Sequence, residues 1–447
     1  MTRFEGMTEE QARRRILAEV RAYCDAYHAP TDEFEPGDRI GYAGRVYDHA
    51  EMENLVDAAL EFWLTAGRYT DRLERALGEY LGVAHVSFVN SGSSANLAAF
   101  AALTAPELGP RAIRPGDEVI TVACGFPTTV APIVQFGAVP VFVDVQIPSY
   151  NVDTSQLDAA LSERTKAIVL AHTLGNPFDV EAVGRLCRER GLWLVEDNCD
   201  ALGSSCLVDG TWRHTGTFGD IATSSFYPPH HMTTGEGGAV YTNDPGLARI
   251  VRSMRDWGRD CACPSGRDNC CGHRFDGRHG TLARGYDHKY VYSHFGFNLK
   301  ATDLQAAVGC AQIEKLPAFT EARKRNHARL RAALSPVRDR LILPQAAPRS
   351  DPSWFGFAMT CRAGVDRTAV VKSLERDGIQ TRMLFAGNIV RHPCFDRMRA
   401  KGEGYRTVGD LRVTDRVMAD TFWVGVYPGM SVAKLDYMAE RICEAVS

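Results

Sequence analysis

The sequence lacks the long apolar segments that enter or cross membranes. Its N-terminal stretch, MTRFEGMTEEQARRRILAEV, contains no apolar core like that of a secretory signal peptide. No later stretch approaches the run of about 18 apolar residues that indicates a transmembrane helix. We therefore expect a protein that has no membrane as a partner, and we place it in the cytoplasm.

A strong charge of either sign is also missing. The 51 Lys and Arg residues and 55 Asp and Glu residues leave a formal net charge of −4 at pH 7. So small a charge creates no overall field that would attract nucleic acid, and it favours a small-molecule ligand. The 45% hydrophobic and 24% charged fractions exclude a disordered or collagen-like chain and supply enough apolar side chains for a large core.

Cysteine is not scarce, but its pattern argues against disulfides. The chain has 13 cysteines, an odd number, and no secretory signal, so we expect reduced thiols. Four of them fall in the short stretch from Cys261 to Cys271. Thiols clustered in this way are typical of metal or redox chemistry.

The order of predicted elements is that of an α/β protein with two domains. Apolar runs such as HVSFV, EVITVA and WLVEDN alternate with helical patterns from about residue 81 to 256, which predicts a largely parallel sheet with helices on both faces. We expect an N-terminal arm at 1–50, a large domain at 51–330 and a smaller C-terminal α/β domain at 331–447. A long loop at 259–293 carries the clustered cysteines, and loops of this length are usually functional.

Two helical patterns flank the predicted sheet. The pattern from Glu51 to Gly78 predicts one amphipathic helix. The pattern from Ala301 to Leu334 predicts a helix that Pro317 kinks or breaks, because proline removes a backbone hydrogen bond. The second helix would lead into the C-terminal domain.

Candidate ligand-binding residues follow two of the predicted strands. The turn NSGSSAN, Asn90–Asn96, opens an apolar helix, and free N–H groups at a helix N-terminus favour a phosphate, although Ser there is also an ordinary helix cap. Asp197 ends the strand WLVED, at the edge where open α/β sheets bind ligands, although a strand-end Asp is also common in turns. The segment SSFYPPH, ending at His230, and then GEGG come next.

In this order, SGSSA, ED, SFYPPH and GEGG resemble the DegT-type sugar aminotransferases, a pyridoxal-phosphate family with the aspartate-aminotransferase fold. The resemblance runs from Tyr42 over nearly all of the remaining chain. It implies fold type I: a large α/β cofactor-binding domain with a mostly parallel mixed sheet, and a smaller C-terminal α/β domain. It also implies a homodimer, because Asn298 matches a position that reaches the phosphate from the neighbouring subunit. The other implied cofactor-binding residues are Ser93, Ser94 and Ser225 at the phosphate, Phe126 stacked on the ring, Asp197 at the pyridinium nitrogen, and Asp200, where many members have Gln.

One position departs from the family. Where the family carries the lysine that binds the cofactor covalently, this sequence has His230. An imidazole cannot make that link, so ordinary lysine-based transamination is excluded. The substitution resembles the 3-dehydrases of 4-keto-6-deoxy nucleotide sugars, which implies pyridoxamine 5′-phosphate, with the pyridoxal form also possible, and His230 as catalytic general base. The alternative interpretation is a degenerate, inactive aminotransferase.

Three thiols of the 259–293 loop have the spacing of a metal-ligand set. Cys261, Cys263 and Cys271 lie where no regular element would hold them apart, and zinc and an iron–sulfur centre both suit them. The triplet resembles the iron–sulfur subclass of the same dehydrases, which implies a 2Fe–2S cluster with Cys199 as its fourth ligand. Two choices stay open, because Cys206 competes with Cys199 and Cys270 competes with Cys271.

The resemblances imply an enzyme that removes the C3 hydroxyl of a nucleotide-linked 4-keto-6-deoxyhexose in deoxysugar biosynthesis. The 3-deoxy product requires two electrons, so a flavin and iron–sulfur reductase or a ferredoxin system is the implied partner. Three alternatives stay open: a cluster-free 3-dehydratase, a nucleotide-sugar aminotransferase that uses Lys289 or Lys300, and a non-catalytic, zinc-stabilised protein that binds sugar or cofactor. CDP- and dTDP-linked sugars both fit, as do lipopolysaccharide biosynthesis and natural product glycosylation.

Three segments combine aromatic, cationic and amide side chains of the kind that bind a sugar diphosphate. Each is equally compatible with core or solvated loop. They are Tyr286–Tyr290, Trp354–Phe357 and Thr381–Asn388.

Overall fold

The computed structural model describes residues 4–29, 33–264 and 266–447. Residues 1–3 and 30–32 of the predicted arm and residue 265 of the predicted loop lie outside the described residues. The centre of the fold is an eight-stranded sheet in the order β1-β9-β8-β5-β4-β2-β3-β14. These strands are β1 (His85–Val89), β2 (Glu118–Val122), β3 (Val139–Val143), β4 (Thr165–Ala171), β5 (Trp193–Asp197), β8 (Ile221–Ser225), β9 (Gly238–Thr242) and β14 (Arg406–Thr407).

The large sheet is mixed, as expected, and buried on both faces. Strand β9 is antiparallel to β1 and β8, whereas β2, β3, β4 and β5 pair in parallel. In β4, Ile168 and Leu170 belong to one apolar core, and Ala167 and Val169 belong to the core on the opposite face. Because neighbouring strand residues point to opposite faces, this double burial requires the continuous apolar runs seen in the sequence.

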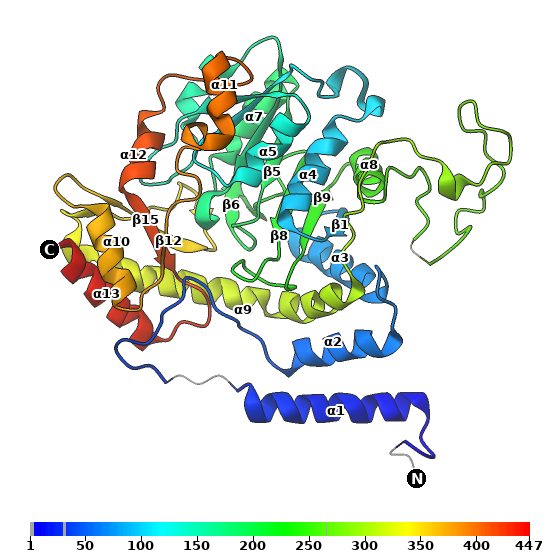
Figure 1. Ribbon diagram of the computed structural model, residues 1–447, viewed down its shortest axis with the longest axis horizontal. Helices are drawn as coiled ribbons and strands as arrows, with labels where there is room; N and C mark the ends of the chain where they lie inside the picture. The colour runs from blue at the N-terminus through cyan, green and yellow to red at the C-terminus, as the bar shows by residue number, and fades with distance from the viewer. Residues whose placement is uncertain (1–3, 30–32, 265) are drawn as a thin grey trace.

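The helices surround this sheet (Figure 1). Helix α4 begins directly after β1, and the long helix α9 runs from the large sheet to the C-terminal part of the chain (Figure 1). The helices are α1 (Glu9–Tyr27), α2 (His49–Glu61), α3 (Arg68–Leu81), α4 (Gly92–Leu103), α5 (Pro127–Gln135), α6 (Leu157–Ala160), α7 (Val180–Arg190), α8 (Pro245–Arg255), α9 (Asp303–Ala333), α10 (Arg367–Arg376), α11 (Asp396–Lys401), α12 (Arg412–Asp420) and α13 (Val432–Val446).

One prediction about helices was wrong, and of the second only the predicted break at Pro317 is contradicted. The single helix expected from Glu51 to Gly78 is two helices, because α2 ends at Phe62, whose backbone is left-handed with φ 54°, and α3 starts after Gly67. Pro317 does not break α9, which is continuous across it. Since α9 packs along α2, α3 and α13, these tertiary contacts outweigh the single backbone hydrogen bond that proline removes.

The N-terminus of α3 is held by a buried carboxylate on α9. Asp303, 1% exposed, accepts hydrogen bonds from the N–H groups of Gly67 (3.0 Å), Tyr69 (3.2 Å) and Thr70 (2.8 Å). A carboxylate at this position satisfies N–H groups that a helix start leaves without an intrahelical partner.

We expect Asp303→Ala to lower the free energy of unfolding by about 2–3 kcal/mol, because it leaves buried N–H groups without an acceptor. Urea denaturation followed by circular dichroism measures the change. The control is Asp436→Ala, whose carboxylate is 51% exposed and pairs with Arg329, and which we expect to cost less than about 1 kcal/mol. Equal losses in the two variants would contradict the role given to Asp303.

The C-terminal part of the chain forms a second, smaller layer. A four-stranded sheet has the order β10-β12-β15-β13 and packs with α10 and α13. The predicted small domain, 331–447, is not wholly separate, because β14 joins the edge of the large sheet beside β3. The remaining strands are β10 (Leu341–Ile342), β12 (Gly356–Cys361), β13 (Thr381–Arg382), β15 (Thr421–Gly425), and the three-stranded set β11 (Ser350–Asp351), β6 (Ser205–Val208) and β7 (Thr211–His214).

Two segments extend away from the sheets. In the predicted arm, α1 packs on α2 and lies at the bottom of the view in Figure 1, and the segment between α8 and α9 projects at the right, on the side away from the C-terminus. We call residues 259–293 of that segment the Cys loop. Within the described residues, the helices are all too short or too polar to cross a bilayer.

Candidate active site

The first part of the site is the turn between β1 and α4. Ser91 caps α4 by accepting a hydrogen bond from the N–H of Ser94 at 3.0 Å. A Cβ atom on Gly92 would stand 2.4 Å from Cβ of Ser225, so only glycine lets the end of β8 approach this turn so closely. The predicted phosphate residues Ser93, Ser94 and Ser225 therefore gather at the positive end of a buried helix, where an anion is stabilised.

The second part is Asp197 at the end of β5. Its side chain is 5% exposed, and Oδ2 accepts hydrogen bonds from Asn96 Nδ2 (2.8 Å) and Thr129 Oγ1 (2.6 Å). Its Oδ1 accepts the N–H of Cys199 at 3.2 Å. Three donors fix the orientation of this carboxylate. The sequence analysis assigned no role to Asn96, although it belongs to the turn Asn90–Asn96, and it did not name Thr129, three residues after Phe126.

The third part is His230, in the loop after β8. Its Nδ1 lies 3.5 Å from Oδ1 of Asp200, at the limit of a hydrogen bond, and this buried nitrogen has no hydrogen-bond partner among the described residues. The ring of Phe355 lies against the imidazole, with the two centroids 5.2 Å apart. The structure thus brings His230, Asp197 and Asp200 to one edge of the sheet, as the sequence predicts.

Burial makes the His230–Asp200 contact a pair of neutral groups. Burial, together with the positive charge of Arg323, lowers the pKa of His230 to about 4, against the opposing effect of Asp197. Burial and the negative charge of Asp197 raise the pKa of Asp200 to about 8. Between these values the imidazole is unprotonated and the carboxyl is protonated, so His230 is available to accept a proton at neutral pH.

The raised pKa of Asp200 makes a prediction about stability. A carboxyl whose pKa is higher in the folded than in the unfolded state loses stabilising proton binding as the pH rises. We expect Asp200→Asn to gain stability relative to the wild type between pH 4 and 8, by at most about 1.4 kcal/mol per pH unit. Urea unfolding of the cofactor-free protein at several pH values measures it. The control is Asp410→Asn, at a side chain that is 60% exposed, for which we expect the difference in unfolding free energy from the wild type to be independent of pH. A difference for Asp200→Asn that also stays constant with pH would contradict the raised pKa of Asp200.

A buried arginine on α9 holds the His230 loop in place. Arg323 is 2% exposed, and its Nη2 donates to the carbonyl oxygens of His230 (3.0 Å) and Pro229 (3.3 Å). Its Nη1 donates to the carbonyl oxygens of Trp354 (3.2 Å) and Phe355 (3.3 Å). One guanidinium therefore connects the loop of His230 to the residues just before β12. No local motif marks this residue in the sequence.

The site fits a pyridine cofactor that carries a phosphate. A helix N-terminus with three hydroxyls suits the phosphate, and the fixed carboxylate of Asp197 suits a protonated ring nitrogen. Phe126 occupies the N-cap position of α5, and its side chain is 53% exposed, so the pyridine ring of a cofactor can stack on it. The unpaired Nδ1 of His230 leaves a buried polar atom for which a ligand can supply a partner.

The other positions named in the sequence analysis do not point into this group. Asn298 is exposed, and its backbone forms a β-bridge with Asp256. It lies beside the phosphate turn, because the carbonyl oxygen of the next residue, Leu299, accepts a hydrogen bond from the N–H of Asn90 at 2.8 Å. The alternative lysines point elsewhere, because Lys300 pairs with Asp256 and Lys289 pairs with Asp268 of the Cys loop. Among the segments considered for the sugar, Trp354 and Phe357 are core residues, 7% and 0% exposed.

The Cys loop brings three predicted ligands together but not the fourth. Cys263 is within side-chain hydrogen-bonding range of both Cys261 and Cys271. Cys199 instead neighbours Asp197, Asp200 and Thr223, in the cofactor pocket. Of the competing thiols, Cys206 is buried in β6, whereas Cys270 is exposed like Cys271 and has its backbone within hydrogen-bonding range of Cys263. Three thiols in contact are a donor set that suits a thiolate-bound metal centre.

A further group of metal-ligand type lies in the same loop. Among the described residues, Asp260, His279 and His288 are the three whose ligand atoms lie within 4.8 Å of one another. His288 Nε2 is 2.7 Å from Asp260 Oδ2, and His288 also lines the crevice that holds the three thiols. No sequence pattern predicted this group, because its members are separated along a loop without periodicity.

Comparisons with known proteins agree with this geometry. The profile of the DegT/DnrJ/EryC1/StrS aminotransferase family matches residues 46–443. The chain is 52% identical over 439 residues to dTDP-4-dehydro-2,6-dideoxy-D-glucose 3-dehydratase of Saccharopolyspora spinosa, covering 98% of this chain and 92% of the relative. It is 50% identical over 440 residues to the lipopolysaccharide biosynthesis protein RfbH of Salmonella typhimurium, covering 98% of this chain and 99% of the relative.

Solved structures give the same result for the fold. The E. coli GDP-4-keto-6-deoxy-D-mannose-3-dehydratase with bound hydrated PLP superposes with a TM-score of 0.78 at 26% identity, over 91% of this chain and 99% of that chain. The expected fold, fold type I of the pyridoxal-phosphate enzymes, is therefore confirmed. The match over most of the chain and the order of site residues together establish that the chain belongs to the DegT/DnrJ/EryC1/StrS aminotransferase family.

Proposed function

We propose that this chain is an enzyme of deoxysugar biosynthesis that removes the C3 hydroxyl of a nucleotide-linked 4-keto-6-deoxyhexose, with pyridoxamine 5′-phosphate as cofactor. The observation that carries the proposal is His230, a buried, unprotonated imidazole at the position where the family holds its cofactor lysine. The relative at 52% identity, a 3-dehydratase of a dTDP-linked sugar, supports the same reaction and favours a dTDP-linked substrate.

The residues of the site have distinct tasks in this reaction. Ser93, Ser94 and Ser225 bind the phosphate, and Asp197, oriented by its three donors, keeps the ring nitrogen protonated. When bound, the cofactor supplies a primary amine for the substrate ketone and a ring that accepts electrons. Phe355, which is buried and lies against the imidazole of His230, keeps water from that side of the base.

His230 is the group that moves the proton. Its pKa of about 4 leaves it free to accept a proton throughout the neutral range, and the bonds of Arg323 to the backbone of its loop fix its position. The protonated Asp200 beside it adds no second negative charge to the pocket. A positioned base of this kind contributes about 10²–10⁴-fold to a rate.

We also propose that the three thiols of the Cys loop bind a 2Fe–2S cluster, with Cys199 as fourth ligand. A bound cluster would supply one-electron transfer, and a flavin and iron–sulfur reductase or a ferredoxin would supply the two electrons that the 3-deoxy sugar requires. The contacts of Cys263 with Cys261 and Cys271 support this assignment. A homodimer, in which Asn298 reaches the neighbouring phosphate, belongs to the same proposal.

A second candidate is a cluster-free 3-dehydratase. It is favoured by one observation: Cys199 lies in the cofactor pocket and not with the triplet. A solved relative, GDP-4-keto-6-deoxymannose-3-dehydratase, holds a trapped PLP–glutamate geminal diamine. In this candidate, glutamate would regenerate the aminated cofactor without a reductase.

Product analysis tests the proposal. Purified protein, pyridoxamine phosphate and a reductase are incubated with dTDP- and CDP-linked 4-keto-6-deoxyglucose and with the 2-deoxy form of the dTDP sugar. We expect a product that has lost the C3 oxygen and gained no nitrogen. Transfer of an amino group to C4 would overturn the proposal, and turnover that depends on glutamate but not on the reductase would favour the cluster-free candidate.

A further inference from the structure

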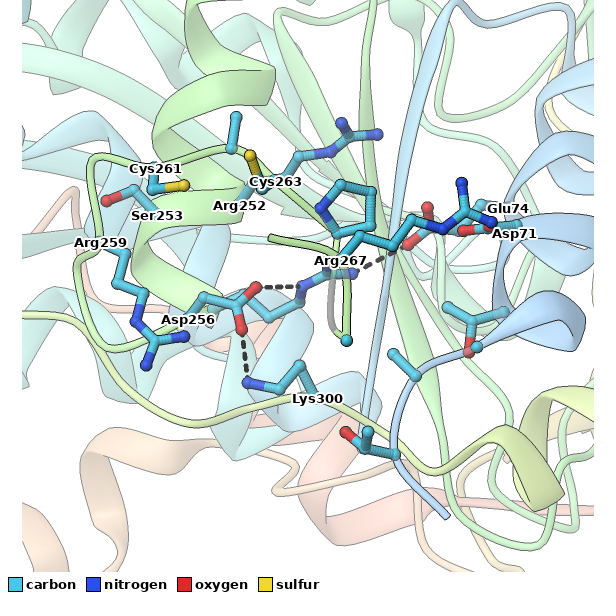
Figure 2. Close-up of a pocket in the computed structure, with 18 of the residues that line it drawn as sticks. Asp71, Glu74, Arg252, Ser253, Asp256, Arg259, Cys261, Cys263, Arg267 and Lys300 are labelled. Carbon is cyan, nitrogen blue, oxygen red and sulfur yellow. Dashed lines mark hydrogen bonds and ion pairs between the residues drawn. The ribbon is translucent and has the colours of Figure 1, made fainter. Parts of the chain in front are cut away.

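The position of Cys199 relative to the other three thiols determines how a metal centre can be built. Cys261 and Cys263 line a cavity of about 780 Å³ between α3, α8 and the Cys loop, together with Arg252, Arg259 and Arg267 (Figure 2). The cavity also reaches His85, the first residue of β1. The triplet therefore lies outside the β1 edge of the large sheet.

Cys199 lies two residues after the carboxyl end of β5 and is partly exposed. Its N–H is bonded to Asp197, and its other neighbours are Asp200 and Thr223. Strands β9 and β8 lie between β1 and β5, which at a strand spacing of about 4.8 Å separates the two by about 14 Å. Helix α8, which packs on β1 and β9, adds to this separation. Cys199 and the triplet of the same chain thus lie on different sides of packed elements.

The Cys loop has the character of a contact surface. It projects from the body of the molecule (Figure 1) and exposes large aromatic side chains. These are Phe275, Tyr286, Tyr290 and Tyr292, 55%, 43%, 53% and 54% exposed, with Phe295 just beyond the loop fully exposed. Aromatic side chains are enriched in protein interfaces and rarely cluster on free surfaces.

The mouth of the cofactor pocket also offers an exposed aromatic side chain. Tyr227, three residues before His230, is 47% exposed, whereas the exposed ring of Phe126 is the one that a bound cofactor would cover. Two copies related by a two-fold axis can place the Cys loop of each on the pocket mouth of the other, which makes two identical contacts and closes the assembly. The same contact carries the triplet toward the thiol that it lacks.

We propose that the metal centre is shared between two copies of the chain, with Cys261, Cys263 and Cys271 from one subunit and Cys199 of the partner subunit. The inference rests on the proposed function, because it concerns the same centre. It places the centre beside Asp197 and His230 of the pocket that it serves, since Cys199 is bonded to Asp197. A dimer then has two centres, and a monomer has none.

Mixed dimers test the sharing directly. Chains carrying Cys199→Ala and chains carrying Cys263→Ala are given different affinity tags and coexpressed, and the dimer with both tags is purified and reconstituted anaerobically with iron and sulfide. If the centre is shared, one site of this dimer has all four thiols and the other lacks two. We expect half of the wild-type iron and acid-labile sulfide, and half of the electron paramagnetic resonance signal after reduction. Each variant homodimer should give only background.

A centre contained within one chain predicts the opposite result. Both chains of the mixed dimer would then lack one ligand, so background iron in the mixed dimer would overturn the proposal. A dimer of wild type with Cys199→Ala calibrates the assay, because it retains one site in either arrangement. Cys271→Ala replaces Cys263→Ala in a second mixed dimer and should again give half. Wild-type protein that takes up no iron and sulfide would contradict the proposed function itself, and a monomeric wild type that takes up a full centre would contradict only the sharing.

Discussion

Replacement of His230 by lysine is expected to abolish C3 dehydration and to restore covalent binding of pyridoxal phosphate. The lysine amine can bond to the cofactor aldehyde, which an imidazole cannot, and the position lies in the pocket beside Asp197 and Asp200. We expect the dehydration rate to fall by about 10²–10⁴-fold, the contribution of a positioned general base. Product formation and retention of the cofactor in denaturant measure the two effects.

The matched variant His230→Asn separates these effects. Asparagine is of similar size and cannot act as a base or bind the cofactor covalently, so it should lose dehydration to the same extent and gain no covalent cofactor. Dehydration at the wild-type rate in either variant would place the base elsewhere in the site. Thermal denaturation shows whether either variant loses its fold. We expect both to remain folded, because Arg323 holds the loop through the backbone carbonyl groups of Pro229 and His230 and not through the imidazole.

Replacement of Cys263 by alanine is expected to reduce the iron and sulfide content to background. Cys263 is the central thiol of the triplet, in contact with both Cys261 and Cys271, so its removal disrupts the donor set more than loss of a peripheral ligand. Conversion to the 3-deoxy sugar with a reductase should be lost with the cluster. Binding of pyridoxamine phosphate should remain, because its residues lie at the carboxyl ends of β5 and β8.

The exposed Cys394 supplies the control, since it lies outside the Cys loop. Cys394→Ala should keep the wild-type content of iron and sulfide. Cys263→Ala with undiminished iron and sulfide would contradict the assignment of the triplet. One stoichiometric zinc without sulfide in the wild type would instead support a structural metal site and remove the electron-transfer part of the proposed function.

The sequence predicted the parts of the site that local patterns specify. The continuous apolar runs predicted the strands, because a doubly buried sheet requires them. The small residues Ser91–Ser94 predicted the start of α4, because serine is a preferred N-cap residue. The departure at His230 was visible because it stands within a fixed order of motifs. These features depend on neighbours in the chain.

The features that the sequence could not predict depend on contacts between distant residues. Asn96 reaches Asp197 across 101 positions, and Arg323 reaches the His230 carbonyl across 93. The continuity of α9 through Pro317 follows from its packing against several helices. Strand β14 has only two residues, too few to show an alternating pattern, so its pairing with β3 could not be predicted. The separation of Cys199 from the triplet likewise follows from the order of strands in the sheet.

Borohydride reduction of the wild-type protein loaded with pyridoxal phosphate, followed by the mass of the intact chain, tests the central claim most directly. With His230 in place of the lysine, no amine in the pocket holds the cofactor, and we predict a chain of unchanged mass. A chain heavier by one reduced cofactor, with the label mapped to a lysine such as Lys289 or Lys300, would contradict the account and indicate an aminotransferase.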